Sequence, residues 1–233
     1  DSREEHGHKF YGDDHLWIVL AVSAYLEETG HFDFLEKEIT FYEKDVPIED
    51  RKTGTVLDHL QRALEFTKNN KGRHGLPLLG FADWNDTVNL KGNAESLFVA
   101  NQYAKSLLDM IELMDQLGDK EQSSTYQKDY VVMKDAINSS AWDGEWYVRY
   151  FEENGTPLGS SKNEQGKIYV NSQSWAVMAK IAPPDRAKKA MDSVNKHLNT
   201  KYGIKLSWPG FNGFDWRKGG ITTYPPGAKE NGG

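Results

Sequence analysis

The sequence contains no cysteine, which excludes disulfide bonds and metal sites built from thiolates. It has no apolar run of membrane-spanning length, and its first residues, DSREEHGHKF, do not resemble a secretory signal peptide. No G-x-x-x-x-G-K-[ST] phosphate loop occurs, so nucleotide chemistry has no support. The formal net charge is −7, which argues against nucleic acid or an anionic membrane as a partner. From these absences we expect a cytoplasmic protein.

Apolar residues recur at helical spacing through most of the chain and predict about six amphipathic helices. Gly30 and Gly118 predict the ends of two helices, and Pro183-Pro184 predicts the start of the last. The apolar positions of the six predicted helices are Leu16/Leu20, Leu57/Leu60/Leu64, Ala100 to Met114, Tyr126/Tyr130/Met133/Ile137, Trp175/Met178 and Ala187/Met191/Val194/Leu198.

Three long loops rich in glycine and aromatic residues separate these helices, at 70–94, 141–170 and 203–233. Within them, EWYVRYF and KIYV predict short β-hairpins. Helical hairpins with long loops at one end indicate a toroid whose inner helices surround a cleft, and six helices are about half of a closed double ring. We therefore expect an all-α fold, an incomplete (α/α)6 toroid with small β-hairpins, in a chain that is part of a longer polypeptide.

The quartet Asp83-Trp84-Asn85-Asp86 stands inside the loop RHGLPLLGFADWNDTVNLKG. In isolation it is typical of a turn or helix cap, because Asp and Asn satisfy free backbone N–H groups. Two acids beside an indole, however, raise the pKa of one of them by desolvation and like charge, which keeps a general acid protonated near neutral pH. Aromatic clusters with interleaved charge, WDGEWYVRYF and SWPGFNGFDW, favour a sugar site over pure packing.

A second cluster, EEHGHKFYGDDHLW, has two interpretations. As a metal site it is weak, because its residues match no helical H-x-x-x-H pattern and nothing downstream closes the ligand set. The alternative is that Asp13 caps the first helix while Asp14 lies in its first turn and binds sugar hydroxyls. The cluster consists of His6, His8, Asp13, Asp14 and His15.

Taken together and in order, five stretches resemble the cellobiose and cellodextrin phosphorylase family, glycoside hydrolase family 94. The resemblance covers essentially the whole chain, and DWND with PPG-x-KENGG is its most specific pair. The five stretches are DDHLWIVLAVSAYLEETG, HGLPLLGFADWNDTVNL, WDGEWYVRYF, GKIYVNSQSWAVMA and TTYPPGAKENGG.

The resemblance implies a glucoamylase-like (α/α)6 toroid that cleaves a β-linked gluco-oligosaccharide with inorganic phosphate, by inversion, to give an α-sugar 1-phosphate. In that family the second aspartate of DWND protonates the glycosidic oxygen, and this role falls on Asp86. Trp84 is implied to line the sugar site and Asp14 to bind hydroxyls of the sugar that receives phosphate. Tyr224 and Glu230 are implied to lie near the site. Phosphate is a co-substrate, and the mechanism needs no metal, nucleotide or organic cofactor.

Asp83 is interpreted as structural, because adjacent turn residues rarely flank a substrate from both sides. The sequence departs from many relatives, which carry an arginine six residues before the position of Asp14; here His8 and Lys9 stand there. The family's amino-terminal β-sandwich and its phosphate-binding histidine are expected outside residues 1–233, so we expect one part of a single catalytic domain, inactive alone. Homodimers among relatives leave a homodimer open for the full-length protein.

Two alternatives remain at this point. An inverting hydrolase on the same toroid requires a distant carboxylate as general base, for which Glu145, Glu164 and Glu230 are the candidates. A non-catalytic fragment would bind saccharide without turning it over.

Overall fold

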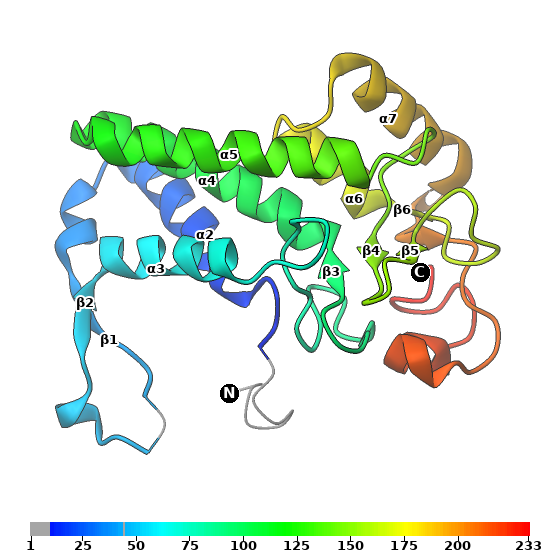
Figure 1. Ribbon diagram of the computed structural model, residues 1–233, viewed down its shortest axis with the longest axis horizontal. Helices are drawn as coiled ribbons and strands as arrows, with labels where there is room; N and C mark the ends of the chain where they lie inside the picture. Colours follow the sequence, from blue (N-terminus) through cyan, green and yellow to red (C-terminus); the bar gives the residue numbers. More distant parts are fainter. Residues whose placement is uncertain (1–9, 44) are drawn as a thin grey trace.

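The computed structural model describes residues 10–43 and 45–233 (Figure 1). Helices dominate this part of the chain, and the strands are two or three residues long. The α-helices are α2 (Asp14–Thr29), α3 (Val56–Asn69), α4 (Leu97–Leu117), α5 (Lys120–Ser140), α6 (Val170–Met178) and α7 (Pro184–Leu198), and the 3-10 helices are η1 (Phe32–Glu36), η2 (Ile48–Asp50) and η3 (Trp216–Thr223).

Helix α4 is the centre of the helical layer, since it contacts α5, α2, α6 and α3. Its apolar residues Leu97, Phe98, Leu107 and Met110 belong to the main core together with residues of α2, α3 and α5. Helix α5 runs back along α4 after a tight turn at Gly118, whose φ of 81° is readily adopted only by glycine (Figure 1). None of the described helices is both long and apolar enough to cross a membrane.

The predicted helix boundaries agree well with the structure because local chemistry defines them. Gly30 ends α2 at φ 66°, and Pro184 opens α7. The side chains of Ser96 and Asp119 accept hydrogen bonds from the backbone N–H groups of Val99 and Gln122, so they cap α4 and α5.

The predicted buried face of α7 is partly wrong. Val194 and Leu198 are buried as expected, but Ala190 completes the face, and Met191 is 39% exposed. The helix is rotated so that Val194 and Leu198 join Trp146 and Ile168 in a small separate core.

Short antiparallel sheets connect segments between the helices; β1–β2 lies outside the three long loops, and the other sheets involve those loops. The strands are β1 (Glu38–Thr40), β2 (Thr53–Thr55), β3 (Glu95–Ser96), β4 (Tyr150–Phe151), β5 (Pro157–Leu158), β6 (Ile168–Tyr169), β7 (Asn199–Thr200), β8 (Gly203–Ile204) and β9 (Ser207–Trp208). The predicted hairpin in EWYVRYF is present as β4–β5 and is extended by β3. The hairpin predicted for KIYV is wrong, because β6 pairs with the distant β9 instead.

The β3–β4–β5 and β6–β9 pairings gather the three long loops at one end of the helical layer, at the opposite end from β1 and β2 (Figure 1). A second apolar core lies beneath them, formed by Leu79, Val88, Leu90, Ala94, Tyr150, Leu158, Phe211 and Ile221. Because this core draws on all three loops, the segments that carry the sequence motifs are packed together.

Candidate active site

The DWND turn lies beside the segment that enters α2. Phe81 N donates to Phe10 O at 2.8 Å, and Gly12 N donates to Ala82 O at 2.8 Å. Gly80 makes this approach feasible, because it has φ 70° and a Cβ there would lie 2.0 Å from Phe10 O. The DD and DWND motifs, some seventy residues apart in sequence, are thus joined by backbone hydrogen bonds.

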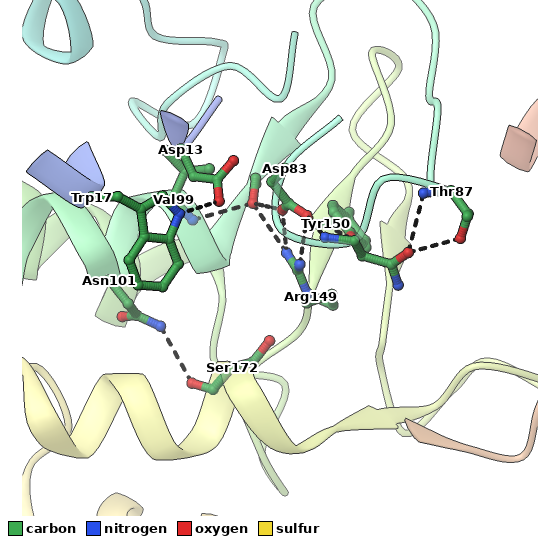
Figure 2. Close-up of polar contacts among 11 residues, drawn as sticks. Asp13, Trp17, Asp83, Thr87, Val99, Asn101, Arg149, Tyr150 and Ser172 are labelled. Carbon is green, nitrogen blue, oxygen red and sulfur yellow. Dashed lines mark hydrogen bonds and ion pairs between the residues drawn. The ribbon is translucent and has the colours of Figure 1, made fainter. Parts of the chain in front are cut away.

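Asp83 is fully buried at the base of the turn and forms a two-pronged ion pair with the equally buried Arg149 (Figure 2). Arg149 Nη1 donates to Oδ2 at 2.7 Å and Nη2 donates to Oδ1 at 2.8 Å. Ser96 Oγ donates to Oδ2 at 2.6 Å, and Tyr150 OH donates to Oδ1 at 3.2 Å. This geometry confirms the structural interpretation of Asp83.

The side-chain amides of Asn85 and Asn89 fix the rest of the turn. Asn85 is buried, and its Oδ1 accepts hydrogen bonds from Thr87 N and Thr87 Oγ1. Asn89 Nδ2 donates to Asp86 O at 3.0 Å, while Asn89 Oδ1 accepts from Gly220 N in η3. Gly219 has φ 80°, and a Cβ on it would overlap Asn89 at 2.6 Å. The turn is therefore fixed between α4 on one side and η3 on the other.

Trp84 and Asp86 alternate with these buried residues and are exposed. Trp84 is 49% exposed, and its ring lies 6.4 Å from that of Phe98. Phe98 in turn contacts Trp17 and Trp175, at centroid distances of 6.2 and 5.3 Å. The result is a half-exposed aromatic surface next to an exposed carboxyl group.

The pKa of Asp86 is raised, first by partial burial and then by the negative charges of Glu230, Asp14 and Asp83. Three predicted site residues, Asp86, Asp14 and Glu230, therefore share one electrostatic environment although they come from three separate motifs. A carboxyl group with a raised pKa that is still reachable from solvent is suited to donating a proton.

Asp13 differs from the expectation. It occupies the N-cap position of α2, but its side chain makes no capping hydrogen bond; Trp17 Nε1 instead donates to its Oδ2 at 2.8 Å (Figure 2). Burial, helped by the nearby charge of Asp83, raises the pKa of Asp13 to about 7. The cap was predicted from residue type alone. The sequence does not show that the Trp17 indole N–H, one turn later, competes with the backbone N–H groups for the Asp13 carboxylate.

The C-terminal motif folds into a tight turn fastened by Asn231. Its Nδ2 donates to Phe211 O at 2.9 Å and to Tyr224 O at 2.7 Å, and its Oδ1 accepts from Phe211 N. The predicted site residue Tyr224 is half-buried in this turn, with Lys229 Nζ 4.9 Å from its ring centroid. Oε2 of Glu230 is buried and has no hydrogen-bond partner among the described residues. A buried carboxylate oxygen of this kind is available to a ligand hydroxyl.

The metal interpretation of the N-terminal cluster gains no support from the geometry. His6 and His8, together with Lys9, lie outside the described residues, and His15 Nε2 pairs with Thr67 Oγ1 at 2.6 Å. Within residues 10–43 and 45–233, no group of three His, Asp or Glu side chains is arranged to hold a metal ion.

Sequence reasoning missed Arg149 and Tyr150, which stand in WDGEWYVRYF, and Ser96. A lone arginine in an aromatic run is a weak cue, and its partner Asp83 lies 66 residues away. The cue that existed was its setting, because a charged residue flanked by aromatic residues that are expected to be buried needs a partner of opposite charge.

Comparison with known proteins agrees with these motifs. The family model for the catalytic domain of the glycosyl hydrolase 94 superfamily matches residues 1–233. The chain therefore belongs to this family.

Relatives include a solabiose phosphorylase from Paenibacillus borealis, 33% identical over 226 residues that cover 95% of this chain and 28% of the relative. An N,N'-diacetylchitobiose phosphorylase from Vibrio proteolyticus is 32% identical, covering 100% of this chain and 28% of the relative. The cyclic beta-(1,2)-glucan synthase NdvB of Rhizobium meliloti is 31% identical, covering 95% of this chain and 8% of the relative. The chain thus spans 28% of the length of each of the two phosphorylases.

Proposed function

We propose that this chain carries the general acid of an inverting glycoside phosphorylase, which cleaves a β-linked gluco-oligosaccharide with inorganic phosphate to give an α-sugar 1-phosphate. The observation that carries the proposal is the exposed Asp86 carboxyl, whose pKa is raised and which stands beside the half-exposed Trp84. The phosphorylases among the relatives favour phosphate as the attacking group.

In the proposed reaction Asp86 gives its proton to the glycosidic oxygen as the bond from that oxygen to C1 breaks. A phosphate oxygen attacks C1 from the opposite face, so a β-linkage yields an α-phosphate. An inverting hydrolase needs a second carboxylate to activate water. Phosphate is already an anionic nucleophile, so one acid suffices. Asp86 is left as a carboxylate, which is reprotonated before the next cycle.

The other predicted residues take binding roles in this proposal. Trp84 stacks on the C–H face of a sugar, and Asp14 accepts hydrogen bonds from the hydroxyls of the sugar that receives phosphate. Glu230, through its unpartnered buried oxygen, accepts from a hydroxyl of the leaving sugar, and Tyr224 shapes the same end of the site. The proposal extends to the architecture: α2 to α7 form part of an (α/α)6 toroid.

The test uses the full-length protein with a panel of β-linked disaccharides, with and without phosphate, assayed for sugar 1-phosphate. Wild type should give product only with phosphate. The Asp86→Asn variant should lose about 10²–10⁴-fold in kcat, the usual contribution of a general acid. A matched control is Asp192→Asn, which removes an exposed carboxylate paired with Lys188 on α7 and should leave the rate unchanged. Equal losses in both variants would contradict the assignment.

One observation favours a second candidate, the inverting hydrolase. Of the three carboxylates considered as base, Glu145 pairs with Lys189 at 3.0 Å, and Glu164 lines a cavity of about 460 Å³ between residues 152–165 and 211–222. Glu230 alone of the three is among the charges that raise the pKa of Asp86. Release of free sugar in the absence of phosphate, lost in both Asp86→Asn and Glu230→Gln, would establish hydrolysis instead. Saccharide binding without turnover would establish a binding role.

A further inference from the structure

Four buried side chains form a polar cluster directly behind the exposed face of the DWND turn, which we call the Asp83 hub: Asp83, Ser96, Arg149 and Tyr150 (Figure 2). Ser96 both caps α4, accepting from Val99 N at 3.2 Å, and donates to Asp83. Arg149 and Tyr150 come from the segment around β4, so the hub ties the turn to the central helix and to the β3–β4–β5 sheet.

Arg149 is fixed more firmly than an ion pair requires. Its guanidinium carbon lies 4.1 Å from the ring centroid of Tyr150 and 5.2 Å from that of Phe98. Its backbone N–H donates to Leu158 O and its carbonyl accepts from Leu97 N. At Gly159, with φ 88°, a Cβ would lie 2.6 Å from Arg149 N, so only glycine allows this approach.

The hub reaches the exposed site residues through short connections. Asp83 Oδ1 accepts a hydrogen bond from Asn85 N at 3.0 Å, which sets the direction of the chain between Trp84 and Asp86. On the other side of Arg149, the Phe98 ring contacts Trp84. Both residues proposed to meet the sugar therefore depend on the same guanidinium for their placement.

We propose that Arg149 is a positioning residue for glycoside cleavage: by donating hydrogen bonds to both carboxylate oxygens of Asp83, it fixes the orientation of the Asp86 carboxyl and the Trp84 ring. This inference rests on the proposed function and adds a residue to it. Arg149 has no exposed surface, so its effect on the reaction passes through Asp83 and Phe98.

The negative charge of Asp83 affects the pKa of Asp86, so a change in the Asp83 hub can be detected in the pH profile, which a purely structural role would not move. Burial raises the pKa of both Asp86 and Asp13, and the negative charge of Asp83 adds to the rise in each case. Burial disfavours the charge on Arg149, but the surrounding groups, the Asp83 carboxylate first among them, together outweigh this, so the pKa of Arg149 is raised and it stays cationic. Tyr150 and Tyr169, whose pKa values are raised by burial, are neutral at working pH.

The first experiment compares Asp83→Asn and Arg149→Lys in the full-length protein, with pH profiles of kcat/KM, which report the free enzyme. Asp83→Asn removes one negative charge and leaves Arg149 positive, so the basic limb should move to lower pH. Arg149→Lys keeps the charge but cannot bind both oxygens. In this variant the basic limb of the kcat/KM profile should stay at the wild-type pH, while kcat falls about tenfold or more. Unmoved limbs and unchanged kcat in both variants would overturn the inference.

A milder matched pair keeps the inference testable if either variant fails to fold. Tyr150→Phe removes one donor to Asp83 and leaves the ion pair intact. Tyr169→Phe is its control, because Tyr169 is also fully buried, its ring lies 6.3 Å from that of Tyr150, and its hydroxyl pairs with Ser207. Tyr150→Phe should lower kcat at least about threefold, and Tyr169→Phe should change it less than about twofold. Equal effects would contradict a positioning role.

The activity of the wild type distinguishes failure of the proposed function from failure of the inference about Arg149. If wild type makes no product from any saccharide, the proposed function fails and this inference fails with it. If wild type is active and the variants show none of these differences, the inference alone is wrong.

Discussion

Replacing Asp13 with asparagine should stabilise the protein at alkaline pH. The side chain is 2% exposed, and burial raises its pKa from 3.8 to about 7, with the charge of Asp83 adding to the effect. In the unfolded chain the carboxyl ionises near pH 4, whereas in the folded protein it keeps its proton until about pH 7. The folded state therefore binds more protons over this range, and the free energy of unfolding falls as pH rises.

The magnitude follows from the same shift. A difference of about three pH units at about 1.4 kcal/mol per unit gives up to about 4 kcal/mol of lost stability, complete above pH 7 and absent below pH 4. The Asp13→Asn side chain cannot ionise and keeps an oxygen to accept from Trp17 Nε1. The variant should therefore gain up to about 4 kcal/mol at pH 8 and match wild type within about 1 kcal/mol at pH 4.

The assay is urea unfolding of the full-length protein at pH 4, 6 and 8, followed by tryptophan fluorescence. The control is Asp33→Asn, which changes an exposed carboxyl on η1 and should shift stability by less than about 0.5 kcal/mol at each pH. A gain in Asp13→Asn that is the same at all three pH values, or a loss at pH 8, would refute the reasoning.

Two further predictions concern the DWND turn. Gly80→Ala should lower the free energy of unfolding in urea more than Gly30→Ala does. Both positions have a similar positive φ, which costs an alanine about 1–3 kcal/mol. Only at Gly80 would the added Cβ also meet Phe10 O, whereas a Cβ at Gly30 would face open space. Equal costs would show that the close approach to Phe10 is not tight. Trp84→Ala should lower saccharide affinity about tenfold, equivalent to about 1.4 kcal/mol of lost stacking, measured by titration calorimetry; an unchanged affinity would remove Trp84 from the sugar site.

Much of the helical fold could be predicted because its determinants are local. Apolar spacing located the six described α-helices, and Gly30 and Gly118 located two of their ends, since only the glycine backbone readily adopts the conformation that closes a helix there. The strand partner of KIYV was missed, because a two-residue strand carries almost no register information and β9 is some forty residues away.

The candidate site divides in the same way. Asp86, Trp84, Asp14, Tyr224 and Glu230 were predicted from motifs, and the structure brings the carboxyl groups of Asp86, Asp14 and Glu230 into one electrostatic environment. No motif indicated the Asp83 hub, which lies behind these residues. The pairing of Asp83 with Arg149 depends on tertiary contacts among three segments, and Asp13 makes no cap because its carboxylate accepts from Trp17 Nε1 instead.

The general-acid role of Asp86 is tested most directly by changing the leaving group. The full-length protein and its Asp86→Asn variant would be compared on a β-linked disaccharide and on the corresponding β-glycosyl fluoride, both with phosphate, by NMR of the products. Fluoride departs with little need of a proton, so the variant should lose about 10²–10⁴-fold on the disaccharide but far less on the fluoride. Both substrates should give the α-anomer of the sugar 1-phosphate in the wild type. Equal losses on the two substrates, or a β-phosphate product, would contradict the proposed mechanism.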